Sequence, residues 1–188
     1  MAATKSARGS SAKNPLAIEL LMSDHRKVEQ LFEQYEDEKE GDEDARRGIA
    51  ERICGELKVH AQVEEELFYP WLREKLPDDE IDMVEEAAIE HQSAKDLIAQ
   101  IEAAGEVDAK FDALVKVLSE YIKHHVKEEE QEIFPEVASE KKALDELGQE
   151  MTARKAELIE EMGFDSDEDT PPPAKAKGTK PEPAQRSR

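Results

Sequence analysis

The feature that most constrains the fold is a long stretch, residues 14–163, in which apolar side chains recur every three or four positions. This spacing places apolar side chains along one face of a helix. Several of the few Pro and Gly residues fall where turns are expected, for example at Gly41, Pro77 and Gly105. No segment shows a convincing strand pattern. The sequence therefore predicts an all-α fold.

The apolar stripes and turn signals divide this stretch into four long helices and a shorter fifth. Asn14 is the expected N-cap of the first helix, with Pro15 in its first turn. The expected helices cover 14–40, 44–70, 77–104, 108–134 and 142–162. Short loops make neighbouring helices antiparallel. We therefore expect an up-down-up-down antiparallel four-helix bundle, with the additional C-terminal helix packing across it or contacting another chain.

The two ends of the chain differ from this stretch in composition. Residues 1–13 are small, polar and basic, and residues 165–188 contain five prolines and no large apolar side chain. Neither end can bury enough apolar surface to offset the entropy of ordering. We expect a disordered basic N-terminal tail over 1–13, the bundle with its C-terminal helix over 14–163, and a disordered Pro-rich tail over 164–188.

Charge and cysteine usage exclude several classes of protein. The chain has 47 acidic against 26 basic residues and a formal net charge of -21, which repels the phosphates of nucleic acids. A single cysteine, Cys54, cannot form an internal disulfide, which fits a reducing compartment. No apolar run approaches the ~18 residues of a membrane span. We expect a cytoplasmic protein with no nucleic-acid or membrane partner. The alternative is a mitochondrial presequence, because the first 18 residues are acid-free.

The histidines are the candidate functional residues. Four of the five, one in each long helix, fall within the apolar stripes at helical spacing from apolar neighbours: His25, His60, His91 and His125. A lone histidine in a core is usually a hydrogen-bonded structural residue. One histidine on the inner face of each of four helices is not expected from chance placement of histidines on the helix surface.

Two glutamates share these inner faces. Glu64 follows His60 by four residues, and Glu129 follows His125 by four, so each pair lies one turn apart on one face. A buried carboxylate needs a cation or a proton. Pro70 and Pro135 each follow the histidine by ten residues, so the two segments read as equivalent halves of one site. A metal site is the simplest interpretation.

The neighbouring polar residues have plainer interpretations. His124 is turned away from His125 and is expected to flank the site. Most of the glutamates in the runs 64–66 and 128–130 are expected to lie on the solvated surface. Glu56 can orient the His60 imidazole, but a surface position is the expectation, and Cys54 is expected to pack between helices.

These residues resemble the hemerythrin-like family, the His-His-Glu (HHE) cation-binding four-helix bundles. The likeness covers roughly residues 14–137 and rests on Asp24-His25, His60-x-x-x-Glu64 running into Leu67-Phe68-Tyr69-Pro70, Glu90-His91, and His125-x-x-x-Glu129 running into Ile133-Phe134-Pro135. The resemblance implies a di-iron centre, oxo- or hydroxo-bridged, with Glu64 and Glu129 bridging and the four histidines as terminal ligands. Manganese and zinc suit the same donors.

The chain departs from hemerythrins proper at two positions. Lys95 stands where they place a further histidine, and Glu129 stands where they use an aspartate one residue further on. An iron pair takes roughly twelve bonds, of which the side chains would supply about eight and a bridging oxygen about two. About two positions would remain for water, O2, NO or peroxide, which favours redox reaction or sensing over reversible O2 carriage.

Three functions follow from these observations. The leading hypothesis is a non-haem di-iron protein that binds or senses O2, NO, peroxide or iron. A second is an enzyme that turns over peroxide or NO at the same centre. A third is a metal-free helical module whose acidic surface docks a basic partner.

Overall fold

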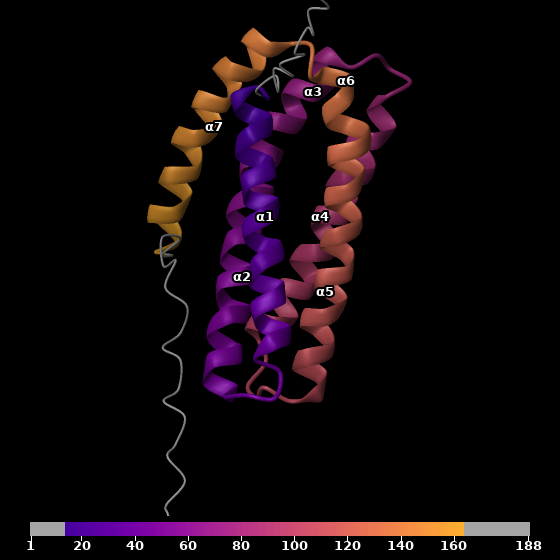
Figure 1. The fold of residues 1–188 in the computed structure, drawn as a ribbon. Coiled ribbons are helices and arrows are strands. Elements are labelled where there is room, and N and C mark those ends of the chain that lie inside the picture. Colours follow the sequence, from indigo (N-terminus) through magenta and orange to yellow (C-terminus); the bar gives the residue numbers. More distant parts are fainter. Residues whose placement is uncertain (1–13, 164–188) are drawn as a thin grey trace, which may run out of the picture.

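The computed structural model describes residues 14–163 and contains helices but no strand in that range. Four long helices form the bundle: α1 (Leu16–Asp37), α2 (Glu43–Val63), α4 (Ile81–Glu102) and α5 (Ala109–Glu128). They run alternately up and down, and α7 (Lys141–Met162) lies outside them against α1 and α2 (Figure 1). The predicted antiparallel bundle with an additional C-terminal helix is confirmed. The predicted tails, 1–13 and 164–188, lie outside the described residues.

Two of the helices, α2 and α5, continue past the prolines at which they were expected to end, Pro70 and Pro135. After α2 the chain continues through a π-helical segment, η1 (Glu64–Phe68), into α3 (Tyr69–Lys75). After α5 it continues through η2 (Glu129–Ile133) into α6 (Phe134–Val137). Proline has no N–H to donate, so it breaks the interior of a helix but fits its first turn. Pro70 and Pro135 each occupy the first turn of the short helix that follows the π segment, so the helical path continues through each proline.

Helix starts were predicted with mixed success. α5 begins next to Asp108, close to the predicted start, and the Asp108 Oδ1 accepts hydrogen bonds from the N–H groups of Lys110 and Phe111, both at 2.9 Å. The prediction of Asn14 as the cap of α1 was wrong. Pro15 is the N-cap, and the Leu16 N–H donates instead to Oδ1 of Asp145, in α7, at 2.8 Å. Asp145, a residue distant in sequence, thus accepts a hydrogen bond at the start of α1 that capping rules assign to the neighbouring Asn14.

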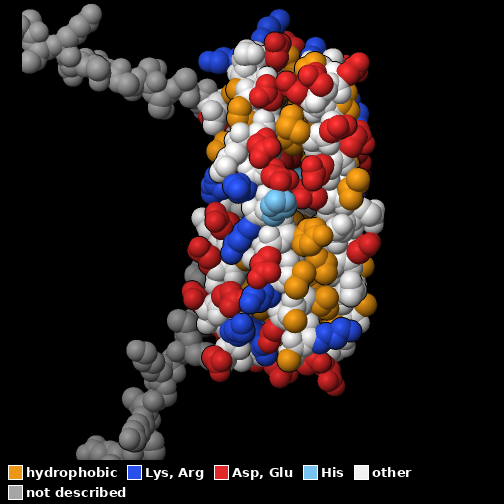
Figure 2. Space-filling view, turned by 90° about the vertical axis from the view of Figure 1, so that its right-hand side faces the viewer, with side chains coloured by type: hydrophobic (Ala, Val, Ile, Leu, Met, Phe, Trp, Pro, Cys, Tyr) orange, Lys and Arg blue, Asp and Glu red, His pale blue; other side chains and the backbone are white. Residues whose placement is uncertain are grey.

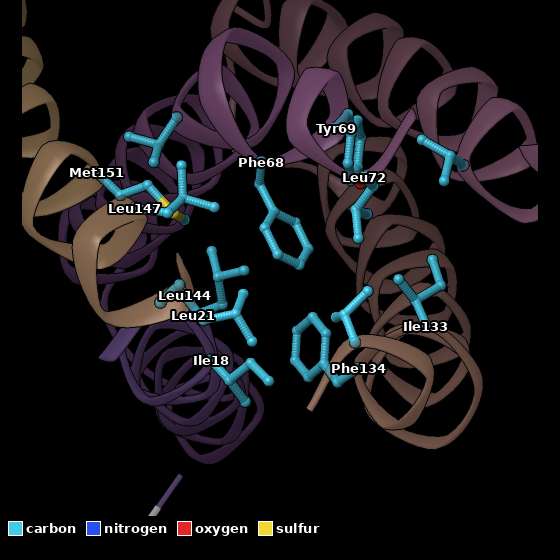
Figure 3. Packing of buried hydrophobic residues seen from close by; sticks show 14 of the residues in the cluster. Ile18, Leu21, Phe68, Tyr69, Leu72, Ile133, Phe134, Leu144, Leu147 and Met151 are labelled. Carbon is cyan, nitrogen blue, oxygen red and sulfur yellow. The ribbon is translucent and has the colours of Figure 1, made fainter. Parts of the chain in front are cut away.

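The apolar core is split into two clusters along the bundle. One surrounds Phe68 and Phe134 and includes the inner face of α7 (Figure 3). The other lies near the α1–α2 turn and contains Phe32, Tyr35 and Phe111. α1, α2 and α4 each pass from one cluster to the other, and α5, which lies in the second cluster, reaches the first through η2; α1, for example, goes from Leu21 to His25 to Val28. A polar layer therefore crosses the bundle between two apolar ones.

The outer surface carries many acidic side chains, with a strip of hydrophobic ones on one face (Figure 2). A groove between α4 and α5 is lined by Ile89, Val117 and Tyr121, which are exposed, and by acidic residues. None of the helices in residues 14–163 is long and apolar enough to cross a membrane.

α7 approaches α1 most closely at Gly148. A β-carbon added there would lie 2.5 Å from the Ala17 backbone nitrogen and 2.7 Å from the Leu16 carbonyl carbon. Only a residue without a side chain allows this crossing. Gly48 in α2 is different, since an added β-carbon would meet no atom within 4 Å among the described residues.

We therefore expect opposite effects from two identical substitutions. Gly148→Ala should lower the free energy of unfolding by about 1–3 kcal/mol, because α7 must move away from α1. Gly48→Ala should raise it by about 1 kcal/mol, because alanine favours an open helical position. Guanidinium denaturation of both variants measures the two values. Equal effects would contradict the close crossing.

Candidate metal centre

All six predicted ligand residues lie together in the polar layer. α1, α2, α4 and α5 each supply one histidine, and each π segment begins at one of the two glutamates. The side chains of Glu64 and Glu129 are 0% exposed, and all four histidines are buried. π-Helical turns inside α-helices are often found at functional sites. The six residues thus converge in the core.

The inward atoms form two groups. In the first, His25 Nε2 lies 3.2 Å from Glu129 Oε2, and His60 Nε2 lies 3.0 Å from Glu64 Oε2. These four residues can each place one donor atom within 4.8 Å of the others.

The second group contains His91, His125 and again Glu64. His91 Nε2 lies 3.3 Å from Glu64 Oε2 and 3.1 Å from His125 Nε2. Glu129 also reaches this group, since its Oε2 is 3.6 Å from His125 Nε2. Both glutamates therefore stand between two pairs of imidazoles, which is the arrangement that bridging carboxylates require.

Several of these atoms have no hydrogen-bond partner among the described residues. They are His25 Nε2, both ring nitrogens of His60, both carboxylate oxygens of Glu64, and Glu129 Oε2. A buried polar atom without a partner is costly, and a buried carboxylate especially so. Imidazole nitrogens and carboxylate oxygens are ligands that iron, manganese and zinc all accept. The donor set therefore fits a metal centre.

Without a cation, the imidazoles and carboxylates shift one another's protonation. Burial lowers the pKa of His60, but Glu64 and Asp24 raise it well above its usual range. His91 behaves similarly, with its pKa raised to about 9 by Glu64 and Glu65 against the effect of burial. Burial raises the pKa of Glu64, whereas His60 and His91 hold it well below its usual value. Positive charge is thus favoured at the centre of the layer.

A second ring of carboxylates faces the outer nitrogen of each imidazole. Glu130 lies 3.0 Å from His25 Nδ1, Glu65 lies 3.1 Å from His91 Nδ1, and Glu90 lies 2.9 Å from His125 Nδ1. Asp24 Oδ2 is 3.5 Å from His60 Nδ1. An ionised carboxylate only accepts, so in a neutral imidazole the Nδ1 that faces one carries the proton, and the inward Nε2 is the nitrogen that can bind a metal.

Basic side chains hold these outer carboxylates in turn. Lys95 Nζ is 2.6 Å from Glu65, Arg26 Nη2 is 2.6 Å from Glu130, and Lys155 of α7 contacts Asp24. The hydrogen bond from His91 is the main cause that lowers the pKa of Glu65, and Lys95 adds to it. Lys95, which stands where hemerythrins proper have a histidine, thus acts through Glu65.

The outer carboxylates are what sequence analysis missed. Most of the glutamates in the runs 64–66 and 128–130 were expected on the solvated surface, yet Glu65 and Glu130 each orient a histidine on another helix. A signal was present, because each directly follows its inward glutamate in the repeated segments. The surface assignment of Glu56 was also wrong: its side chain is 4% exposed and lies 2.6 Å from Lys27 Nζ, while Asp24 faces His60.

The remaining predictions about neighbouring residues agree with the structure. Cys54 is buried, and burial together with Glu102 raises the pKa of its thiol to about 12, as suits a packing residue. His124 is exposed beside Glu128, at 3.1 Å, and Glu90, at 3.6 Å, so it flanks the site.

A small apolar cavity adjoins the imidazoles on the side of the Phe111 cluster. Its volume is about 20 Å³, enough for one water-sized molecule. The four histidines form part of its wall, and Val28, Leu57, Ala94, Ile98 and Ile122 are among the apolar side chains that line it. A small ligand at the inner nitrogens would therefore be shielded from water.

Comparison with known proteins identifies the family. The model of the family "Hemerythrin HHE cation binding domain" matches residues 16–162, so the chain belongs to this family. The chain is also 24% identical over 158 residues to a DNA nickase from Nostoc sp. (strain PCC 7120 / SAG 25.82 / UTEX 2576), a match that covers 83% of this chain. The match covers 44% of the nickase, so the chain spans less than half of that protein's length. No solved structure matches the chain.

Proposed function

We propose that this member of the HHE cation-binding family is a non-haem di-iron protein that binds or senses O2, NO, peroxide or iron. The observation that carries the proposal is the pair of buried donor groups that share Glu64, with their inner atoms unsatisfied. Glu64 and Glu129 would bridge the two metals. His25 and His60 would hold one metal, and His91 and His125 the other.

The bound iron pair would supply affinity for a small ligand and the capacity to exchange electrons with it. The chain's own residues do the rest. Glu65, Glu90 and Glu130 fix the tautomer of the imidazole that each contacts and raise its basicity, and Asp24 faces the fourth imidazole. The two apolar clusters exclude water on either side, and the small cavity limits the ligand to a molecule of a few atoms.

The likeness to a DNA nickase does not indicate nickase activity in this chain. At 24% identity and less than half of that protein's length, the match carries no activity over to this chain. A net charge of -21 also opposes binding to a phosphate backbone.

We expect the purified protein, reconstituted with Fe(II) without oxygen, to bind about two irons per chain. Its absorption spectrum should change when NO or O2 is added. His60→Asn should lose iron, because it removes an inner donor, whereas His124→Asn should not, because His124 lies at the surface. Elemental analysis and absorption spectra measure both. Trace iron in the wild-type chain would instead favour a metal-free interaction module.

Steady consumption of peroxide or NO by the iron-loaded protein would distinguish turnover from binding. The matched control is the His60→Asn variant under the same conditions. A stoichiometric reaction that stops after one equivalent supports binding or sensing.

Iron should also stabilise the fold. Removing it leaves Glu64 and Glu129 buried with imidazoles and, for Glu129, the Tyr69 hydroxyl as their only partners, so the free energy of unfolding should fall by several kcal/mol. Guanidinium denaturation with and without a chelator measures this change. Curves that coincide would argue against a metal in the core.

The role of the outer carboxylates can be tested with Glu130→Gln and a control substitution at Glu132. Glu130→Gln keeps the shape of the side chain but removes the charge that faces His25, so iron affinity should fall by about 10- to 100-fold. Glu132→Gln, at an exposed position two residues on, should leave it unchanged. Competition with a chelator of known affinity measures both. Equal affinities would show that Glu130 does not support His25.

A further inference from the structure

A phenol hydroxyl lies among the inner atoms of the proposed metal centre. The Tyr69 side chain is 1% exposed, and its Oη is 3.1 Å from His91 Nε2 and 3.1 Å from Glu129 Oε1. The ring lies beside the imidazole of His91, with 5.2 Å between the centroids. Tyr69 is thus the one tyrosine in the described chain whose hydroxyl points at ligand atoms of the site.

The two halves of the site differ at this position. Tyr69 follows Glu64 by five residues and precedes a proline; Phe134 follows Glu129 by five and also precedes a proline. Phe134 lies parallel to the ring of His25, at an interplanar angle of 2°, and offers no oxygen. The pair of histidines His91 and His125 therefore has a phenol beside it, whereas His25 has only the Phe134 ring.

The distances around Tyr69 match those between ligands of one metal. Two ligands in adjacent positions of an octahedral ion, each bonded at about 2.1 Å, lie about 3.0 Å apart. Tyr69 Oη lies 3.1 Å from both His91 Nε2 and Glu129 Oε1, and His91 Nε2 lies 3.1 Å from His125 Nε2. The phenol oxygen therefore stands where a further ligand of that metal would stand.

We propose that Tyr69 is a ligand, through its Oη, of the metal held by His91 and His125. This inference rests on the proposed di-iron function. In the metal-free chain the hydroxyl donates to Glu129; metal binding replaces that proton, which leaves for solvent, and no electron is transferred. Phenolate oxygen is an established ligand of ferric iron in haem proteins.

This assignment makes the two metals chemically different. One has imidazoles and bridging carboxylates as its side-chain ligands, while the other gains an anionic oxygen that favours the ferric state. It also fills one of the roughly two positions that the six predicted ligands and a bridging oxygen leave open. External ligands should then bind at the metal of His25 and His60, where the facing residue is Phe134.

The test uses the ferric protein and the chain's three tyrosines, Tyr35, Tyr69 and Tyr121. A ferric phenolate gives a visible charge-transfer band, and resonance Raman excitation in that band shows phenolate ring modes. We expect both in the wild-type protein and in the double variant Tyr35→Phe/Tyr121→Phe, which leaves Tyr69 alone. Tyr69→Phe should still bind iron but lack both signals; the second half of the chain already has Phe at this place.

Each outcome separates this inference from the function on which it rests. Iron bound without phenolate modes in the wild-type protein would overturn the Tyr69 assignment and leave the di-iron centre intact. Phenolate modes that vanish in the double variant would overturn it as well. Phenolate modes that persist there support it even if Tyr69→Phe fails to fold. Absence of bound iron in the wild-type protein would overturn both proposals.

Discussion

Two carboxylates removed from water, Glu64 and Glu129, create the requirement that the rest of the core satisfies. Each would be several kcal/mol too costly to bury alone. Imidazoles from all four long helices contact these two glutamates, and outer carboxylates contact the imidazoles. Basic side chains pair with three of the outer carboxylates, so that charge alternates from the centre outward. The proposed metal pair would occupy the centre of this sequence of charges.

At the start of each π segment, two neighbouring glutamates have different partners. Glu64 and Glu65 are adjacent in the chain, yet one faces the centre and the other faces His91 Nδ1 from outside. The same holds for Glu129 and Glu130 in the other half. Both pairs lie at the start of a π segment that leads to a proline. The local widening of the helix and the ligand geometry therefore occur at the same place in each half.

Much of the fold was predictable from the sequence because the signals are local and repeated. Apolar spacing placed the five main helices, and the repeat of His, Glu and Pro placed the inward side chains. The missed features depend on contacts between distant residues. Asp145 caps α1 from α7, Lys27 draws Glu56 inward, and Glu130 reaches His25 across the bundle. The spacing of residues within one helix carries no information about these contacts between helices. The continuation past Pro70 and Pro135 was missed because a proline ordinarily marks a helix end.

The outer carboxylates also link the two helical hairpins, which are α1 with α2 and α4 with α5. Asp24 and Glu90 serve a histidine in their own hairpin, whereas Glu65 and Glu130 serve one in the other. Neither hairpin by itself carries a finished half of the centre. The full set of inner and outer side chains around the proposed centre is therefore complete only where the two hairpins are packed together.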